Sequence, residues 1–148
     1  MRSNERPAQV NQTTNQVIAC DHAAMLQGVD ILLVEDELDI AELLIVMLES
    51  AGASVAWATL AEEALTVIQH SQPDVLLCNV KLPDRNGDWL IRQIRTKEAG
   101  QSYHLPAVAV TSFARDVTAE RMLSAGFDRF LSKLQSPNEI VLTIAQLL

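Results

Sequence analysis

From residue 29 onward, hydrophobic positions follow two alternating patterns. Short continuous apolar runs, such as residues 31–34 and 75–78, are typical of strands that are buried on both faces of a parallel sheet. Between these runs, apolar residues recur every three or four positions, which is the period of an amphipathic helix. The strict alternation predicts βα units arranged around one parallel sheet, and therefore an α/β fold.

The pattern places five expected strands at residues 31–34, 54–57, 74–78, 106–110 and 127–131. The five expected helices cover residues 37–51, 60–70, 88–97, 116–125 and 136–148. Gly52 is expected to end the first helix, and the hydroxyl of Thr59 to cap the start of the second. Because crossovers between parallel strands are right-handed, this (βα)5 chain favours a doubly wound five-stranded sheet.

The first 28 residues differ from the rest of the chain. They are rich in Asn, Gln, Thr and Ser and lack a sustained apolar period. We therefore expect residues 1–28 to form a flexible polar N-terminal extension and residues 29–148 to form one domain. Nothing after the fifth expected strand resembles a DNA-reading module.

Composition narrows the function classes. The formal net charge of −8 argues against a surface that binds the phosphate backbone of nucleic acids. No apolar run approaches the roughly 20 residues of a membrane-spanning helix, and the N-terminus lacks the apolar segment of a secretory signal. Cys20 and Cys78 are far apart and are expected to be free thiols of a reducing compartment. We therefore expect a cytoplasmic protein without direct nucleic-acid or membrane contacts.

Acidic residues directly follow the first expected strand. In doubly wound sheets, ligands bind at the carboxyl ends of the strands, and Glu35 and Asp36 stand at such an end. Carboxylate oxygens that are partly open to water suit Mg²⁺ or Mn²⁺. The other reading is a solvated acidic start of a helix, which the helix dipole favours.

Polar residues also follow three further strands. Asn79 closes the third, Thr111 and Ser112 follow the fourth, and Lys133 follows the fifth. The hydroxyls suit either a bound oxyanion or hydrogen bonds within a loop, while a lysine suits a carboxylate, a phosphoryl oxygen or solvent. Each residue is unspecific alone, but complementary groups at four strand ends together indicate a site.

These residues fall in four segments with ordinary spacing: residues 33–37, residues 79–83 followed by Gly87, residues 110–112, and residues 130–133. With them, the chain from about residue 30 to residue 148 resembles the receiver domain of two-component response regulators. The resemblance implies a flavodoxin-like fold with strand order 2-1-3-4-5. It also implies a signalling module of a phosphorelay, with a histidine kinase or another signalling protein as partner.

The resemblance assigns a role to each matching position. In the family the acidic pair binds a divalent metal, which here implies Mg²⁺ held by Glu35, Asp36, Asn79 and the backbone carbonyl of Lys81. The residue at position 79 receives the phosphoryl group, which the residues at Thr111 and Lys133 contact, and the aromatic residue at Phe130 changes rotamer as a switch. The fourth helix, fifth strand and fifth helix would form a docking or homodimer face.

Three positions depart from the family pattern. Asn79 replaces the phosphoacceptor aspartate, Asn86 stands where an aspartate often precedes the glycine, and Leu134 replaces the usual proline. An amide oxygen is neutral and a poor nucleophile, so we expect no phosphorylation at Asn79 and a weakened Mg²⁺ site. A peptide bond before Leu134 makes a cis form costlier than before proline. We expect a pseudo-receiver that acts through protein contacts and has no enzymatic turnover.

Several alternatives stay open at this stage. Asn79 is either natural, which Asn86 and Leu134 favour, or an engineered block in an ordinary phosphoaccepting receiver. The domain is either free-standing or one part of a hybrid kinase. A small α/β enzyme that binds a nucleotide or metal is a reading of another class, but the first strand is not followed by a Gly-rich loop. Redox sensing at Cys78 would require an exposed thiol.

Overall fold

The computed structural model describes residues 24–111, 116–132 and 137–148. Strands and helices alternate along this part of the chain, in the order β1 (Asp30–Val34), α2 (Leu38–Ser50), β2 (Ser54–Ala58), α3 (Ala61–Ser71), β3 (Val75–Asn79), α4 (Gly87–Glu98), β4 (Ala107–Thr111), α5 (Asp116–Ala125), β5 (Arg129–Ser132) and α6 (Pro137–Leu147). The predicted elements are confirmed in type and order, and their ends differ from the observed ones by two residues or fewer.

The five strands form one parallel sheet in the order β2-β1-β3-β4-β5. The predicted flavodoxin-like topology is therefore confirmed. The register pairs Val34 with Cys78 and Asn79 with Val110. The carboxyl ends of β1, β3 and β4 consequently lie side by side, and this edge carries Glu35, Asn79 and Thr111.

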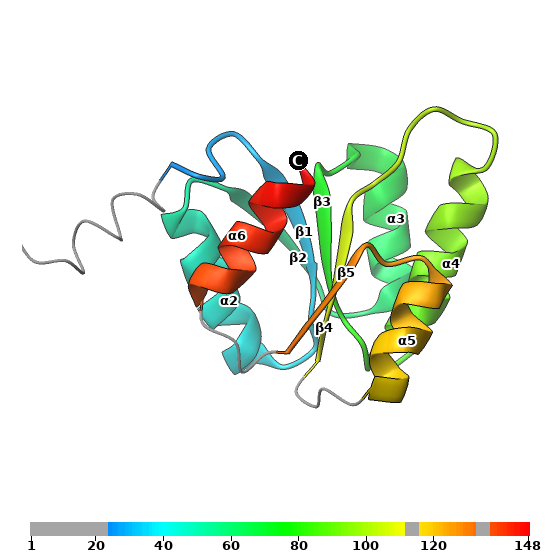
Figure 1. Cartoon of the computed structure of the whole chain (residues 1–148). Coiled ribbons are helices and arrows are strands. Elements are labelled where there is room, and N and C mark those ends of the chain that lie inside the picture. Colours follow the sequence, from blue (N-terminus) through cyan, green and yellow to red (C-terminus); the bar gives the residue numbers. More distant parts are fainter. Residues whose placement is uncertain (1–23, 112–115, 133–136) are drawn as a thin grey trace, which may run out of the picture.

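The sheet separates two hydrophobic layers, because successive side chains of a strand point to opposite faces. Figure 1 shows α2 and α6 covering one face and α3, α4 and α5 covering the other. On β1, Ile31 and Leu33 pack in the core under α2 and α6, while Leu32 and Val34 pack in the core under the other helices. Burial on both faces accounts for the continuous apolar runs in the sequence.

The packed chain begins before the boundary at residue 29 that was expected from the sequence. Leu26 is fully buried with the core under α2 and α6, and its backbone N–H donates to the carbonyl of Ala51 at 2.8 Å. The segment just before β1 therefore closes the core beside the end of α2. Within the described parts of the chain, every helix is too short or too polar to span a lipid bilayer.

The start of α3 differs from the prediction that Thr59 caps it. Leu60 occupies the N-cap position, and its side chain makes no capping hydrogen bond. The backbone N–H of Thr59 instead donates to the side chain of Glu63 at 3.0 Å. The first N–H groups of the helix are satisfied by Asp84, which follows β3.

Candidate functional site

The side-chain amide of Asn79 lies where three oxygen atoms converge. Its nitrogen, Nδ2, donates to Glu35 Oε2 at 3.2 Å, to Asp36 Oδ1 at 3.2 Å and to the backbone carbonyl of Lys81 at 2.8 Å. A primary amide carries two N–H donors, so the three oxygens share them. Four residues predicted to form a site are therefore brought together around one nitrogen atom.

The surrounding acceptors determine which way the Asn79 amide faces. Turning the amide by half a rotation would place its carbonyl oxygen against two carboxylates and a carbonyl, none of which can donate a hydrogen bond. Because Asn79 is only 7% exposed, water cannot readily compensate such an arrangement. With the nitrogen inward, the amide supplies the donors that the oxygens require.

Glu35 is held rigidly at the end of β1. Glu35 is 1% exposed. Its backbone N–H donates to the carbonyl of Ala58 at 3.0 Å, and its own carbonyl accepts a hydrogen bond from the indole Nε1 of Trp57 at 2.8 Å. The carboxylate also accepts from the backbone N–H of Glu37 at 3.2 Å. Asp36, by contrast, is exposed. The pair thus combines a buried, fixed carboxylate with a solvated one.

The loop after β3 turns back tightly against Asn79. Val80 continues the sheet by donating to Val110 at 3.0 Å, and Gly87 then donates to the carbonyl of Val80 at 2.7 Å. A Cβ atom on Gly87 would lie 2.8 Å from the backbone oxygen of Asn79, closer than real Cβ contacts allow. This close approach explains why the motif requires glycine at this position.

Asp84 anchors the same loop to α3, a role that sequence analysis missed. Its carboxylate oxygens accept hydrogen bonds from the backbone N–H groups of Ala61 at 2.9 Å and Glu62 at 3.0 Å. Slight burial opposes ionisation, but these backbone donors outweigh it and hold the pKa of Asp84 below its ordinary value. The loop that carries the Lys81 carbonyl is therefore fixed at Asn79 and again at Asp84.

Asp88 joins α4 to α5 just beyond this loop. Its buried carboxylate accepts from Arg92 on the same helix at 3.0 Å and from Nε of Arg121 on α5 at 3.1 Å. Burial disfavours the charged carboxylate, but the two guanidinium groups outweigh this and lower the pKa of Asp88. The start of α4 is thereby tied both to the site and to the neighbouring helix.

The remaining predicted site residues lie on β4 and β5 or beyond them. Thr111 ends β4 and is buried, and Phe130 on β5 is partly buried against the core under α3, α4 and α5. Ser112, Lys133 and Leu134 lie outside the described residues. The roles of Thr111, Lys133 and Phe130 remain predictions.

Cys78 lies inside β3 and is fully buried. Burial raises the pKa of its thiol, and the nearby charge of Glu35 raises it further. The thiol donates a hydrogen bond to the backbone oxygen of Asn79 at 3.2 Å. A buried thiol that resists deprotonation is a poor redox sensor, which argues against that alternative.

The oxygens around Asn79 are of the type that binds a divalent cation. Two carboxylate oxygens and a backbone carbonyl are the hard ligands that Mg²⁺ prefers. Within the described residues, no cluster of three or more His, Cys, Asp and Glu side chains suits a metal ion, and the three oxygens already accept N–H donors from Asn79. The oxygens are thus of the type that Mg²⁺ prefers, and the Asn79 amide occupies the point where they converge.

Comparisons with known proteins identify the family of the chain. The family model described as the response regulator receiver domain matches residues 31–145. A Leptolyngbya boryana protein, described as an uncharacterized 14.6 kDa protein in the sodA1 3' region, is 36% identical over 121 residues, which cover 82% of this chain and 91% of that protein. The probable transcriptional regulatory protein TcrX of Mycobacterium tuberculosis is 32% identical over 124 residues, and this match covers 82% of this chain and 50% of that protein. The chain thus spans about half the length of that regulator.

Solved structures share the fold. A putative response regulator from Chloroflexus aurantiacus superposes with a TM-score of 0.73 at 31% identity, covering 80% of this chain and 96% of that one. The BeF3-activated N-terminal receiver domain of Klebsiella pneumoniae RstA gives a TM-score of 0.73 at 24% identity, covering 80% of this chain and 97% of that one, and shows likeness of fold. The family match, the strand order and the acidic strand end agree, and this chain belongs to the response regulator receiver domain family.

Proposed function

We propose that this receiver domain does not accept a phosphoryl group at position 79 and acts through contacts with other proteins. Receiver domains are signalling modules that interact with histidine kinases and other signalling proteins. The observation that carries the proposal is the Asn79 amide, whose nitrogen donates to Glu35, Asp36 and Lys81. The position that would offer a nucleophilic oxygen instead offers N–H donors to its neighbours.

Chemistry supports this reading. Phosphoryl transfer to a side chain needs an anionic oxygen in line with the donor phosphorus. The amide of Asn79 is neutral, and its three hydrogen bonds would have to break before its oxygen could face Glu35 and Asp36. The proposed role is therefore binding without turnover, so the chain is not an enzyme.

A divalent cation, proposed to be Mg²⁺, would be held by Glu35, Asp36, the carbonyl of Lys81 and the amide oxygen of Asn79. Bound there, it would supply positive charge between the carboxylates. The amide already satisfies the same oxygens, so we propose an affinity well below that of an aspartate at position 79. A cation is therefore not required for this arrangement to persist.

The proposed partners are a histidine kinase or another signalling protein in the cytoplasm, with no direct contact to nucleic acid or membrane. A second copy of the chain is a further candidate partner, through the face formed by α5, β5 and α6. Three features support it: β5 is an edge strand of the sheet, and Leu123 on α5 and Leu142 on α6 are exposed. Ile140, Val141 and Ile144 are buried, so most of the wide apolar surface of α6 belongs to the core.

The phosphorylation proposal is tested by incubating the chain with acetyl phosphate and Mg²⁺ and measuring intact mass. We expect no gain of a phosphoryl group, because no carboxylate occupies position 79. The Asn79→Asp variant is the matched positive control, and its phosphorylation would show that the rest of the pocket is competent. A stable phosphoryl adduct on the unchanged protein that fragmentation maps to residue 79 would overturn the proposal.

The dimer proposal is tested by light scattering across a range of concentrations. Leu142→Asp should abolish any self-association, whereas Leu43→Asp should not, because Leu43 is exposed on α2, which is not one of the elements of the proposed face. A monomer at every concentration, or equal effects of the two variants, would remove the homodimer from the list of partners.

A further inference from the structure

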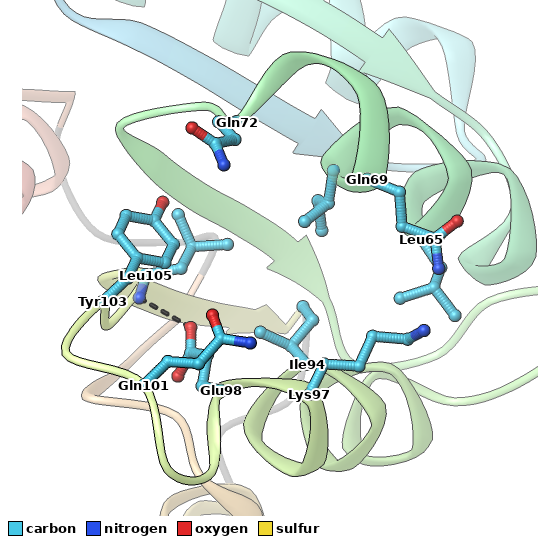
Figure 2. A pocket seen from close by; sticks show the side chains of 10 residues that line it. Leu65, Gln69, Gln72, Ile94, Lys97, Glu98, Gln101, Tyr103 and Leu105 are labelled. Atoms are coloured by element: carbon cyan, nitrogen blue, oxygen red, sulfur yellow. Dashed lines mark hydrogen bonds between the residues drawn. The ribbon is translucent and has the colours of Figure 1, made fainter.

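A cavity of about 290 Å³ lies between α3 and α4, at the edge of the sheet opposite to Asn79. Figure 2 shows it between the ends of the two helices and the loop that leads into β4. Its apolar surface comes from Leu65 and Ile68 on α3, from Ile94 on α4 and from Leu105. Its volume is close to the lower end of small-molecule sites, which is roughly 300 Å³.

The wall of this cavity is held by specific hydrogen bonds. The Tyr103 hydroxyl donates to the backbone carbonyl of Pro73 at 3.1 Å and so ties the loop to the start of β3. The next anchor is Leu105, whose N–H donates to Glu98 at 2.8 Å and whose carbonyl accepts from Arg95 at 2.8 Å. A cavity with a wall fixed in this way is formed before a ligand arrives, which lowers the entropic cost of binding.

Several polar side chains around the cavity are exposed to solvent and have no protein partner among the described residues. Gln69, Gln72, Lys97 and Gln101 line it, and within the described ranges none of their side chains forms a hydrogen bond or ion pair. In Figure 2, Gln69 and Lys97 lie toward one end of the cavity and Tyr103 toward the other. The cavity thus has an apolar middle and polar side chains at both ends, with Gln101 and Glu98 beside Tyr103.

Lys97 is the cation in the lining and favours an anion at its end of the cavity. Glu98 is the carboxylate in the lining, and it shares Arg95 with Asp128, because the guanidinium lies 2.9 Å from Glu98 and 3.1 Å from Asp128. Lys97 has no such partner among the described residues, so its ammonium group is the unpaired charge of the lining. An anionic group beside Lys97 would gain charge-assisted hydrogen bonds there and from the amide of Gln69.

We infer that this cavity binds a small monocarboxylic acid with an apolar body. The apolar body would lie over Leu65, Ile68 and Ile94, with a ring near Tyr103 and the carboxylate at Lys97. The volume suits one aromatic ring with a short acid chain. The cavity lies near the amino ends of β3 and β4, whereas Asn79 lies at the carboxyl end of β3. The binding proposal for the cavity is therefore independent of the phosphorylation proposal for Asn79.

The test uses 3-phenylpropionate as the probe and 3-phenylpropylamine as a probe of similar shape and opposite charge. Each is titrated into the ¹⁵N-labelled full chain, and amide chemical shifts are followed. The acid should produce saturable shifts at the ends of α3 and α4 and in residues 99–105, and the amine should bind more weakly. Equal responses to both probes, shifts mainly elsewhere, or no saturable shifts up to the solubility of the acid would overturn the inference.

Two variants and a control sharpen the test. Lys97→Gln should weaken binding of the acid by about 1.5- to 5-fold, the value of an exposed ion pair, and leave binding of the amine unweakened. Leu65→Trp should fill the cavity and remove binding of the acid. Arg85→Gln removes one positive charge near the opposite edge of the sheet and should leave binding unchanged. If Leu65→Trp does not fold, Lys97→Gln decides, and unchanged affinity in that variant contradicts the inference.

Discussion

The carboxylate of Asp84 accepts a hydrogen bond at 3.0 Å from the backbone N–H of Glu62, a residue 22 positions earlier in the chain. Together with the bond from Ala61, it supplies the N-terminal cap that α3 lacks in its own sequence. The loop after β3 and the start of α3 are therefore one structural unit. Because Lys81 lies on this loop, the cap also helps to position a carbonyl of the site.

Replacing Asp84 with Ala should lower the free energy of unfolding by about 0.5–2 kcal/mol, the usual cost of losing a helix N-cap. The effect arises because the N–H groups of Ala61 and Glu62 lose their acceptor. Urea unfolding followed by circular dichroism measures it. Glu42→Ala is the control, since Glu42 is exposed on α2 and makes no hydrogen bond or ion pair within the described residues. Equal effects of the two substitutions would contradict the capping role.

The loss of unfolding free energy at acid pH should depend on Asp84 and Asp88. Both carboxyls have a pKa below the ordinary value of 3.8 in the folded protein. Their contribution is therefore fully present above about pH 4 and is lost as the pH falls toward the lower folded values. The double variant Asp84→Asn, Asp88→Asn should lose less stability than the unchanged protein over this acid range. Parallel curves of unfolding free energy against pH would refute the assignment.

A double-mutant cycle on Asp88 and Arg121 should give a coupling free energy of about 0.5–3 kcal/mol. The Asp88 side chain is 5% exposed and the Arg121 side chain 59% exposed, so the pair is more than a surface contact but less than a buried one. The cycle compares Asp88→Ala, Arg121→Ala and the double variant by urea unfolding. Additive effects would mean that this bridge does not hold α5 against α4.

Asn79→Asp should destabilise the protein in the presence of EDTA by about 1–3 kcal/mol, because Glu35 and Asp36 lose a buried hydrogen-bond donor and gain a like charge. Added Mg²⁺ should restore stability in this variant by preferential binding to the folded state. It should change the melting temperature of the unchanged protein little. Asn86→Asp, the same change at an exposed position of the loop, is the control and should respond to neither condition. A large Mg²⁺ response of the unchanged protein would disagree with the proposed weak site.

Cys78 should react with a thiol reagent only when the protein opens. In a Cys20→Ser background Cys78 is the remaining thiol, and burial raises its pKa. Labelling monitored by mass spectrometry should be slow in buffer and fast in denaturant. Rapid labelling of the folded protein would revive the redox alternative.

Sequence patterns were sufficient for the fold because both faces of the sheet are covered. The runs at β1 and β3 are continuous, and the helical periods between them are regular, so neither element type was ambiguous. The exception is the segment around Leu26, which is buried although the first 28 residues lack a sustained apolar period. A single buried leucine produces no period and was therefore assigned to the extension.

For the site, sequence could indicate which residues meet but not how their atoms face one another. Glu35, Asp36, Asn79 and the Lys81 carbonyl meet as the motifs suggested. The inward direction of the Asn79 nitrogen follows from the acceptors around it, which only the folded chain assembles. Asp84 was missed for a similar reason: a cap supplied from 22 residues away leaves no local signal beyond the missing cap at Leu60.

The indole of Trp57 donates a hydrogen bond to the backbone carbonyl of Glu35, so a natural fluorophore directly contacts a residue of the acidic pocket. Indole emission responds to hydrogen bonding and to nearby charge, so an ion or partner that moves Glu35 can be observed without a label. Trp89, whose ring lies 4.9 Å from the guanidinium of Arg85, is the other tryptophan of the chain, and Trp89→Phe would leave Trp57 alone. The domain thus carries its own optical reporter.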